Sequence, residues 1–275
     1  MELYWYVVVF IFGAIMGSFL NVVIYRLHTG RSLSGRSHCM SCGKTLLWYE
    51  LFPLFSYISQ KGMCRGCLAY IPTRYFVVEL LTALLYVSVW HIFGSDLVTM
   101  LLYAVLVSLF VIILVYDIRH TIIPDELTIA VSGIVLMLIG YEYLQVGDIL
   151  AIGERLLSGF GAGLFFWGLW YASKGRWIGL GDAKLALPLG ALAYGLGSFS
   201  MVVFSFWIGA CISLALLGVE RLSKKWKTHL HFLSTPLTIK SEVPFAPFLI
   251  AGFLLVQFLH ADIFSVTYAL FFFLE

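Results

Sequence analysis

Apolar segments about as long as a membrane-crossing helix recur along the whole chain. A bilayer core takes about 20 helical residues, and the segments that approach this length are residues 3–23, 75–93, 97–116, 127–145, 156–172, 183–196, 199–219 and 245–260. Hydrophobic residues make up 61% of the chain and charged residues 12%, which leaves too little polar surface to coat a globule. We therefore predict an all-α polytopic membrane protein with about eight transmembrane helices, and we exclude a soluble enzyme and a disordered chain.

The basic residues predict how this bundle is oriented, because Lys and Arg near helix ends stay in the cytoplasm. If the N-terminus is outside and there are eight crossings, every Lys and Arg except Arg155 lies on the cytoplasmic side. Residues 263–274 are too short to count as a further crossing. The net charge of +2 gives no basic surface of the kind that binds nucleic acid.

One polar insertion interrupts the apolar pattern. The predicted organisation is a first transmembrane helix over residues 1–23, an insertion over residues 24–74 and a helical bundle over residues 75–275. The orientation above places the insertion in the cytoplasm.

Four of the five cysteines lie in this insertion as two Cys-x-x-Cys pairs: Cys39 with Cys42, and Cys64 with Cys67. Four thiolates in a reducing compartment favour a closed, structural zinc site. A metal would also order a segment that has little core of its own. A redox role for the two pairs is the alternative, and His38 is an alternative ligand.

Two aspartates, Asp117 and Asp182, lie at the predicted cytoplasmic ends of two membrane helices. Acidic residues are costly at such positions and mark functional sites. Gly179 and Gly181 precede the second aspartate and allow the backbone to bend and to approach a ligand. A carboxyl pair that shares one proton is the arrangement of an aspartic protease, so we predict a peptidase dyad.

Structural roles for these acids remain open. Asp182 alone could be a helix-start residue beside Lys184, and Asp117 alone could pair with Arg119 or His120. Asp125 is a rival third acid, but it follows a proline at a helix start, where acidic residues are common.

Helix ends also predict which carboxyl holds the shared proton. Asp117 ends one helix, where the partial charge is negative, and Asp182 begins another, where it is positive. We therefore expect Asp182 to be the ionised base and Asp117 the protonated acid.

Five blocks in order resemble the type IV prepilin peptidases, which are bifunctional leader peptidases and N-methyltransferases of bacterial inner membranes. The blocks are residues 17–26 (GSFLNVVIYR), the two cysteine pairs, Asp117 with residues 123–125 (IPD), residues 179–185 (GLGDAKL) and residues 243–248 (VPFAPF). Together they cover nearly the whole chain.

The resemblance implies a membrane aspartic endopeptidase in which Asp117 and Asp182 are catalytic, supported by Gly179, Gly181 and Asp125. Such an enzyme cuts a short basic leader from prepilins and pseudopilins of type IV pilus and type II secretion systems at the cytoplasmic face. It then methylates the new N-terminal residue with S-adenosylmethionine. The substrate would present a basic leader to the cytoplasm and an apolar N-terminal helix to the bundle and the lipid bilayer.

Residues that bind the methyl donor are harder to predict. The glycine-rich run 159–163 follows no strand, so small residues at a helix contact explain it better than a nucleotide-binding turn. Polar residues near the insertion are the candidates: Asn21, Arg26, Glu50 and Glu79.

Two other classes of function stay open. A proton-coupled transporter could use the two aspartates as a relay, but it should carry acids near mid-membrane and similar halves. A zinc-bearing scaffold without activity would leave Gly179 and Gly181 unexplained.

Overall fold

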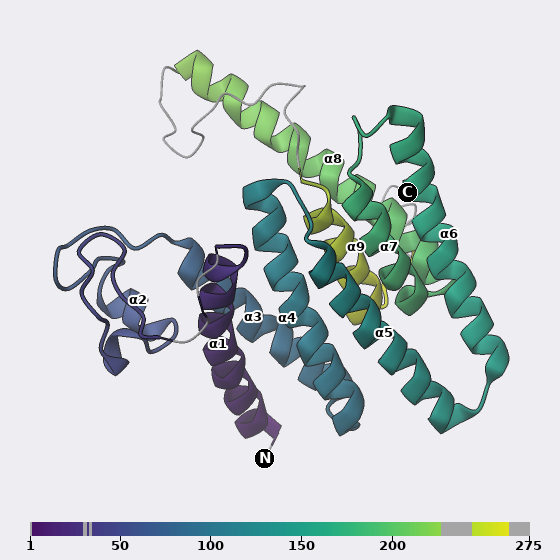
Figure 1. Ribbon diagram of the computed structural model, residues 1–275, viewed down its shortest axis with the longest axis horizontal. Helices are drawn as coiled ribbons and strands as arrows, with labels where there is room; N and C mark the ends of the chain where they lie inside the picture. Colours follow the sequence, from purple (N-terminus) through teal and green to yellow (C-terminus); the bar gives the residue numbers. More distant parts are fainter. Residues whose placement is uncertain (1, 30–31, 33–34, 227–243, 264–275) are drawn as a thin grey trace, which may run out of the picture. The chain divides into compact units, whose positions relative to one another are not determined.

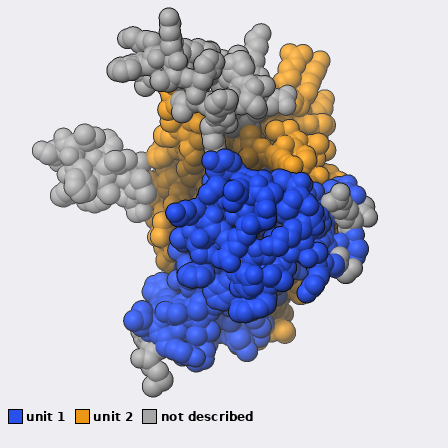
Figure 2. Space-filling model, turned by 90° about the vertical axis from the view of Figure 1, so that its left-hand side faces the viewer, with its two compact units in different colours: residues 1–115 blue, residues 116–275 orange. Residues whose placement is uncertain are grey.

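The computed structural model describes residues 2–29, 32, 35–226 and 244–263. Within these residues the named secondary-structure elements are all helices (Figure 1). Two compact units divide the chain, residues 1–115 and residues 116–275 (Figure 2). The boundary falls inside α4 (Leu97–His120).

The first unit pairs two apolar helices, α1 (Glu2–Arg26) and α3 (Arg74–Phe93), around glycines of α1. A side chain at Gly13 or Gly17 would bring its Cβ within 2.8 Å of the Ala83 Cα or 2.7 Å of the Glu79 Cα. Such contacts let two helix backbones approach closely, as is common in membranes. Stacked rings of Phe93 and Tyr103, with centroids 4.0 Å apart, join α3 to α4.

Between α1 and α3 lies the polar insertion, whose helices, among its described residues, are short. These are the 3₁₀ turn η1 (Trp48–Glu50) and α2 (Phe55–Ser59). Neither was expected from the apolar runs, because three and five residues are far fewer than the window of about 11–18 residues in which helical periodicity can be recognised.

The second unit is built around α7 (Leu180–Ala193), in which ten of 14 residues are buried. Its other helices are α5 (Asp125–Val146), α6 (Ile149–Ser173), α8 (Gly195–Trp226) and α9 (Ala246–Leu259). Helix α7 contacts all four of them. A residue of α7 is therefore held from several sides.

The predicted all-α membrane class is confirmed, and a helix occupies each of the eight predicted positions. Six of the helices, α1, α3, α4, α5, α6 and α8, are long and apolar enough to cross a membrane. Helices α7 and α9 have 14 residues each and are about 21 Å long, so their crossing stays a prediction. The orientation of the bundle in the membrane also stays a prediction, as does the division of the chain into residues 1–23, 24–74 and 75–275. Residues 264–274 and Val243 lie outside the described part of the chain.

The glycine-rich run of α6 packs against α7. A Cβ at Gly159 would lie 2.6 Å from the Leu187 carbonyl oxygen, and one at Gly190 would lie 2.7 Å from the Ala162 Cβ. Gly161, on the same stretch of α6, has open space around it. The predicted role of the run as a helix contact is confirmed at Gly159, where small size is needed because the opposing atoms are backbone.

We predict that Gly159→Ala destabilises the protein by about 1–3 kcal/mol, because the new methyl group forces α6 away from α7. Gly161→Ala is the matched control and should be neutral or stabilising by about 0.5–1 kcal/mol, since alanine is the better helix former. Thermal unfolding of the purified protein in detergent measures both. Equal stabilities of the two variants would contradict the packing described above.

Candidate active site and metal site

The four cysteines of the insertion converge on one point. Two short loops present them, each closed by a backbone hydrogen bond from the first cysteine of its pair: Cys39 N–H to Lys44 O at 2.8 Å and Cys64 N–H to Ala69 O at 2.9 Å. All four Sγ atoms lie within 4.8 Å of one another. The Sγ atoms of Cys39 and Cys67 are 3.8 Å apart.

This spacing fits a tetrahedral metal site. Metal–sulfur bonds of roughly 2.3 Å place the sulfur atoms about 3.8 Å apart. His38, the alternative ligand, is not part of the cluster; its Nδ1 lies 3.5 Å from the Arg36 carbonyl oxygen. The predicted set of ligands, four cysteines, is thus the set that the fold brings together.

A buried carboxylate stabilises the first cysteine loop. The side chain of Glu50 is only 1% exposed and lies 3.1 Å from the Lys44 ammonium, and it accepts a 2.9 Å hydrogen bond from the Leu47 N–H. The Leu47 N–H and then the Lys44 ammonium hold the pKa of Glu50 below its usual value. Glu50 therefore stays ionised at neutral pH and links the loop to η1.

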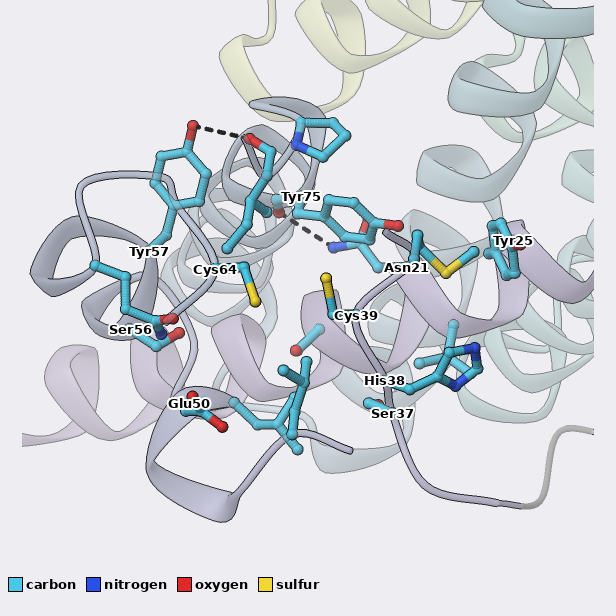
Figure 3. Close-up of a pocket in the computed structure, with 18 of the residues that line it drawn as sticks. Asn21, Tyr25, Ser37, His38, Cys39, Glu50, Ser56, Tyr57, Cys64 and Tyr75 are labelled. Carbon is cyan, nitrogen blue, oxygen red and sulfur yellow. Dashed lines mark hydrogen bonds between the residues drawn. The ribbon is translucent and has the colours of Figure 1, made fainter. Parts of the chain in front are cut away.

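A pocket of about 560 Å³ lies between this insertion and the adjoining ends of α1 and α3 (Figure 3). All four predicted methyl-donor residues line it: Asn21, Arg26, Glu50 and Glu79. Cys39 and Cys64 line it too, so the pocket shares a wall with the cysteine cluster. Its volume is in the range of small-molecule sites.

Hydrogen bonds hold three of these residues in place. The Asn21 side-chain amide donates to the Tyr75 carbonyl oxygen at 3.1 Å, which is one of the dashed lines in Figure 3. The Glu79 carboxylate accepts the Leu54 N–H at 2.8 Å, and the Arg26 guanidinium donates to the Ser32 carbonyl oxygen at 2.6 Å. The pocket wall is therefore ordered by links between the insertion and both helices.

In the second unit, the two predicted catalytic aspartates lie together. Asp117 is in the last turn of α4 and Asp182 in the first turn of α7, and they are only 4% and 7% exposed. Their carboxylates are close enough to interact electrostatically. The fold thus brings together two acids that are far apart in the sequence.

Each carboxylate accepts a backbone hydrogen bond at the beginning of a helix. Asp182 Oδ2 accepts the Gly179 N–H at 3.0 Å, and Asp117 Oδ2 accepts the Ala246 N–H at 3.2 Å. Ala246 is the first residue of α9. Sequence analysis assigned it no role, although it lies in one of the blocks that carried the family resemblance.

The hydrogen bond from α9 reduces the difference between the two aspartates on which the assignment of the shared proton depends. That assignment considered only the C-terminus of α4 for Asp117. Since Asp117 also faces the N-terminus of α9, a partially positive helix end acts on both carboxylates. Only Asp117 also adjoins a helix C-terminus, so the helix ends still favour Asp182 as the ionised base by a smaller difference, and this assignment stays a prediction.

Gly179 and Gly181 provide space beside Asp182. Gly179 has φ of −73°, which any residue can adopt, so backbone bending is not what requires glycine there. A Cβ at Gly179 would lie 3.2 Å from Asp182 Oδ2, and one at Gly181 would lie 3.1 Å from the Ile123 Cβ. Both glycines thus allow close packing of protein atoms beside Asp182, and the predicted approach of the backbone to a ligand stays a prediction.

Asp125 lies apart from this buried pair. Its side chain is 63% exposed and forms an ion pair with Lys184 at 2.6 Å. Lys184, named above as a neighbour for Asp182 in a purely structural role, is thus paired with Asp125. Asp125 begins α5 directly after Pro124, as the helix-start interpretation predicts.

The fold and these sites define a multi-pass helical membrane protein that carries a four-cysteine cluster and a buried pair of aspartates. The Bacterial Peptidase A24 N-terminal domain matches residues 11–93, and the type IV leader peptidase family matches residues 104–214. The chain belongs to the type IV leader peptidase family and is a bifunctional enzyme of its leader peptidase and N-methyltransferase class. The resemblance stated from the sequence is confirmed.

Three similar proteins all bear the description "Prepilin leader peptidase/N-methyltransferase". The Aeromonas hydrophila protein is 31% identical over 90% of this chain and 88% of its own length, and the Bacillus subtilis protein is 30% identical over 93% and 94%. The Myxococcus xanthus protein is 34% identical over 77% of this chain, and the match spans 63% of its own length. No solved structure matches the chain.

Proposed function

We propose that this enzyme cleaves the short basic leader peptide from type IV prepilins and pseudopilins at the cytoplasmic face of a bacterial inner membrane, and that it then methylates the new N-terminus. The observation that carries the proteolytic part is the buried pair Asp117 and Asp182, each oriented by a backbone N–H. The names of the relatives support prepilins as substrates.

The aspartate pair has the features that peptide hydrolysis requires. One carboxylate acts as a base on water, while its protonated partner polarises the scissile carbonyl. Burial makes sharing a single proton favourable, because two neighbouring carboxylates cannot both ionise readily in a low-dielectric environment. A substrate whose cleavage site adjoins an apolar helix explains why the pair lies among membrane helices.

We predict that Asp117→Asn and Asp182→Asn each reduce leader cleavage by roughly 10²–10⁴-fold or more, because each removes either the base or the acid. Each variant keeps the shape of its side chain and a carbonyl oxygen that can accept the N–H of Ala246 or Gly179. Cleavage of a prepilin by the purified protein, followed by mass spectrometry, measures the loss.

The matched control is Asp125→Asn, which removes only a solvent-exposed ion pair worth at most about 1 kcal/mol. It should retain most of the activity. An inactive Asp125→Asn together with a fully active Asp117→Asn, both folded in membranes, would falsify the assignment of the pair.

We further propose that the four cysteines hold one structural zinc ion. Four thiolate ligands fill a tetrahedral site and leave no open position for water, so the ion orders the insertion and takes no part in chemistry. The spacing of the sulfur atoms supports this role.

We predict one zinc ion per chain by metal analysis of protein purified without chelators. Cys42→Ser with Cys67→Ser should abolish binding and speed proteolysis of residues 35–72, while the helices stay folded. Methylation should fall more than cleavage, because the aspartates lie in the other unit. Cys211→Ser is the control, since Cys211 is a free thiol outside the cluster. Zinc-free native protein would contradict the proposal.

For the methyl donor, we propose the pocket lined by Asn21, Arg26, Glu50 and Glu79. S-adenosylmethionine supplies an electrophilic methyl group on a cationic sulfonium, and the two glutamates offer negative charge in a pocket of suitable volume. Of the two, Glu79 is the better test because Glu50 is already paired with Lys44.

We predict that Glu79→Gln weakens binding of S-adenosylmethionine by about tenfold, because it removes a negative charge from the pocket. The glutamine side-chain oxygen can still accept the Leu54 N–H, so the pocket wall should keep its structure. S-adenosylhomocysteine, whose sulfur is neutral, should lose less affinity. Equilibrium binding measures both ligands, with Glu126→Gln as the control outside the pocket. Equal losses for the two ligands would argue against a charge contact.

A proton-coupled transporter is less well supported. Asp117 and Asp182 lie in the end turns of their helices, whereas a relay is expected to place acids near mid-membrane.

A further inference from the structure

The short helix α2 of the insertion exposes large apolar side chains, whereas a helix that faces water usually exposes polar ones. Of its two serines, Ser56 is buried and Ser59 is exposed, while Phe55 is 66% exposed and Ile58 is 64% exposed. Phe55 and Ile58 are three residues apart and so share one helix face. The ring of Phe52, 53% exposed, contacts that of Phe55 with centroids 6.3 Å apart. These three side chains form one outward apolar surface, here called the α2 surface.

The inner side of α2 attaches it to the first turns of α3. Tyr57 packs its ring against Phe76, with centroids 5.4 Å apart, and the Leu54 N–H bonds to Glu79. Glu79 is the sixth residue of α3, about 7.5 Å along the helix from its start. Helix α2 is therefore held beside the end of a candidate membrane span.

The pocket also places the insertion beside the last turns of α1. Ser18 and Asn21 line the pocket together with residues of the insertion, and Ser18 is eight residues before the end of α1. In Figure 1 the insertion lies alongside the C-terminal half of α1. Helix α2 thus lies beside the C-terminal turns of α1 and the N-terminal turns of α3, which are the ends of two candidate membrane spans.

The insertion also has the charge of a membrane-binding segment. Residues 24–74 contain seven Lys and Arg but only one acidic residue, Glu50. Lys61, which is exposed, lies three residues after Ile58, just beyond the end of α2. Basic residues beside aromatic and aliphatic ones are the composition of interfacial helices on anionic membranes.

We propose that α2 is an interfacial helix, whose apolar surface of Phe52, Phe55 and Ile58 inserts among the headgroups of acidic phospholipids in the leaflet where α1 ends and α3 begins. The insertion then lies against the membrane with its pocket at the headgroup level, instead of standing free in water. Exposed aromatic side chains, costly in water, gain an apolar environment there.

Photo-crosslinking of the full-length protein tests this proposal. p-Benzoylphenylalanine in place of Phe55 should crosslink to phospholipid in nanodiscs of phosphatidylethanolamine and phosphatidylglycerol. The matched control places it at Thr45, an exposed polar position of the same insertion, where lipid crosslinks should be severalfold fewer. In nanodiscs of phosphatidylcholine alone, the yield at Phe55 should fall, because the basic residues lose their anionic partners.

Zinc content, measured on every variant, reports that the insertion is folded. Lipid crosslinks at Phe55 that exceed those at Thr45 and depend on phosphatidylglycerol support the proposal. Crosslinks from Phe55 to a second protein chain, or equal lipid yields at the two positions, overturn it. So does a yield at Phe55 that is the same in both lipid mixtures.

Discussion

Two carboxylates buried among the helices of the second unit each need a hydrogen-bond donor, and meeting this need constrains how those helices pack. An acid without a donor is unfavourable in such a place, and here each aspartate takes a backbone N–H from the beginning of a helix. The donor for Asp182 comes from its own turn, whereas the donor for Asp117 comes from α9, 129 residues further on. The position of α9 is therefore part of the site, although none of its side chains is assigned to the chemistry.

Close packing of small residues makes this arrangement possible. Helix α7 carries Asp182 and contacts four other helices, and glycines allow the closest of these approaches. Gly159 faces the backbone of α7, and Gly181 faces Ile123 immediately before α5. Without a water-driven hydrophobic effect between membrane helices, such van der Waals contacts hold the helices together. They also fix where the carboxylate lies.

The insertion is organised by a different principle. With a small apolar core, it depends on convergent thiolates, the buried Glu50 and links to α1 and α3 for its order. Its exposed aromatic residues Phe52 and Phe55 do not contribute to an interior, and we propose above that they face lipid. In the proposals above, this one segment combines a metal site, a ligand pocket and a membrane-facing surface.

The sequence by itself determined the helical membrane class, the cysteine set and the two aspartates, because apolar length, paired cysteines and intramembrane acids are local signals that do not depend on the rest of the fold. Only the tertiary structure decided which N–H groups serve the carboxylates, that Asn21, Arg26, Glu50 and Glu79 share one pocket, and that α2 turns its apolar side outward. These features arise from contacts between segments distant in the chain. The short helix α2 shows the reason most clearly: its five residues carry no periodicity from which a buried face could be read, and the direction of Phe55 follows from where Tyr57 and Leu54 meet α3.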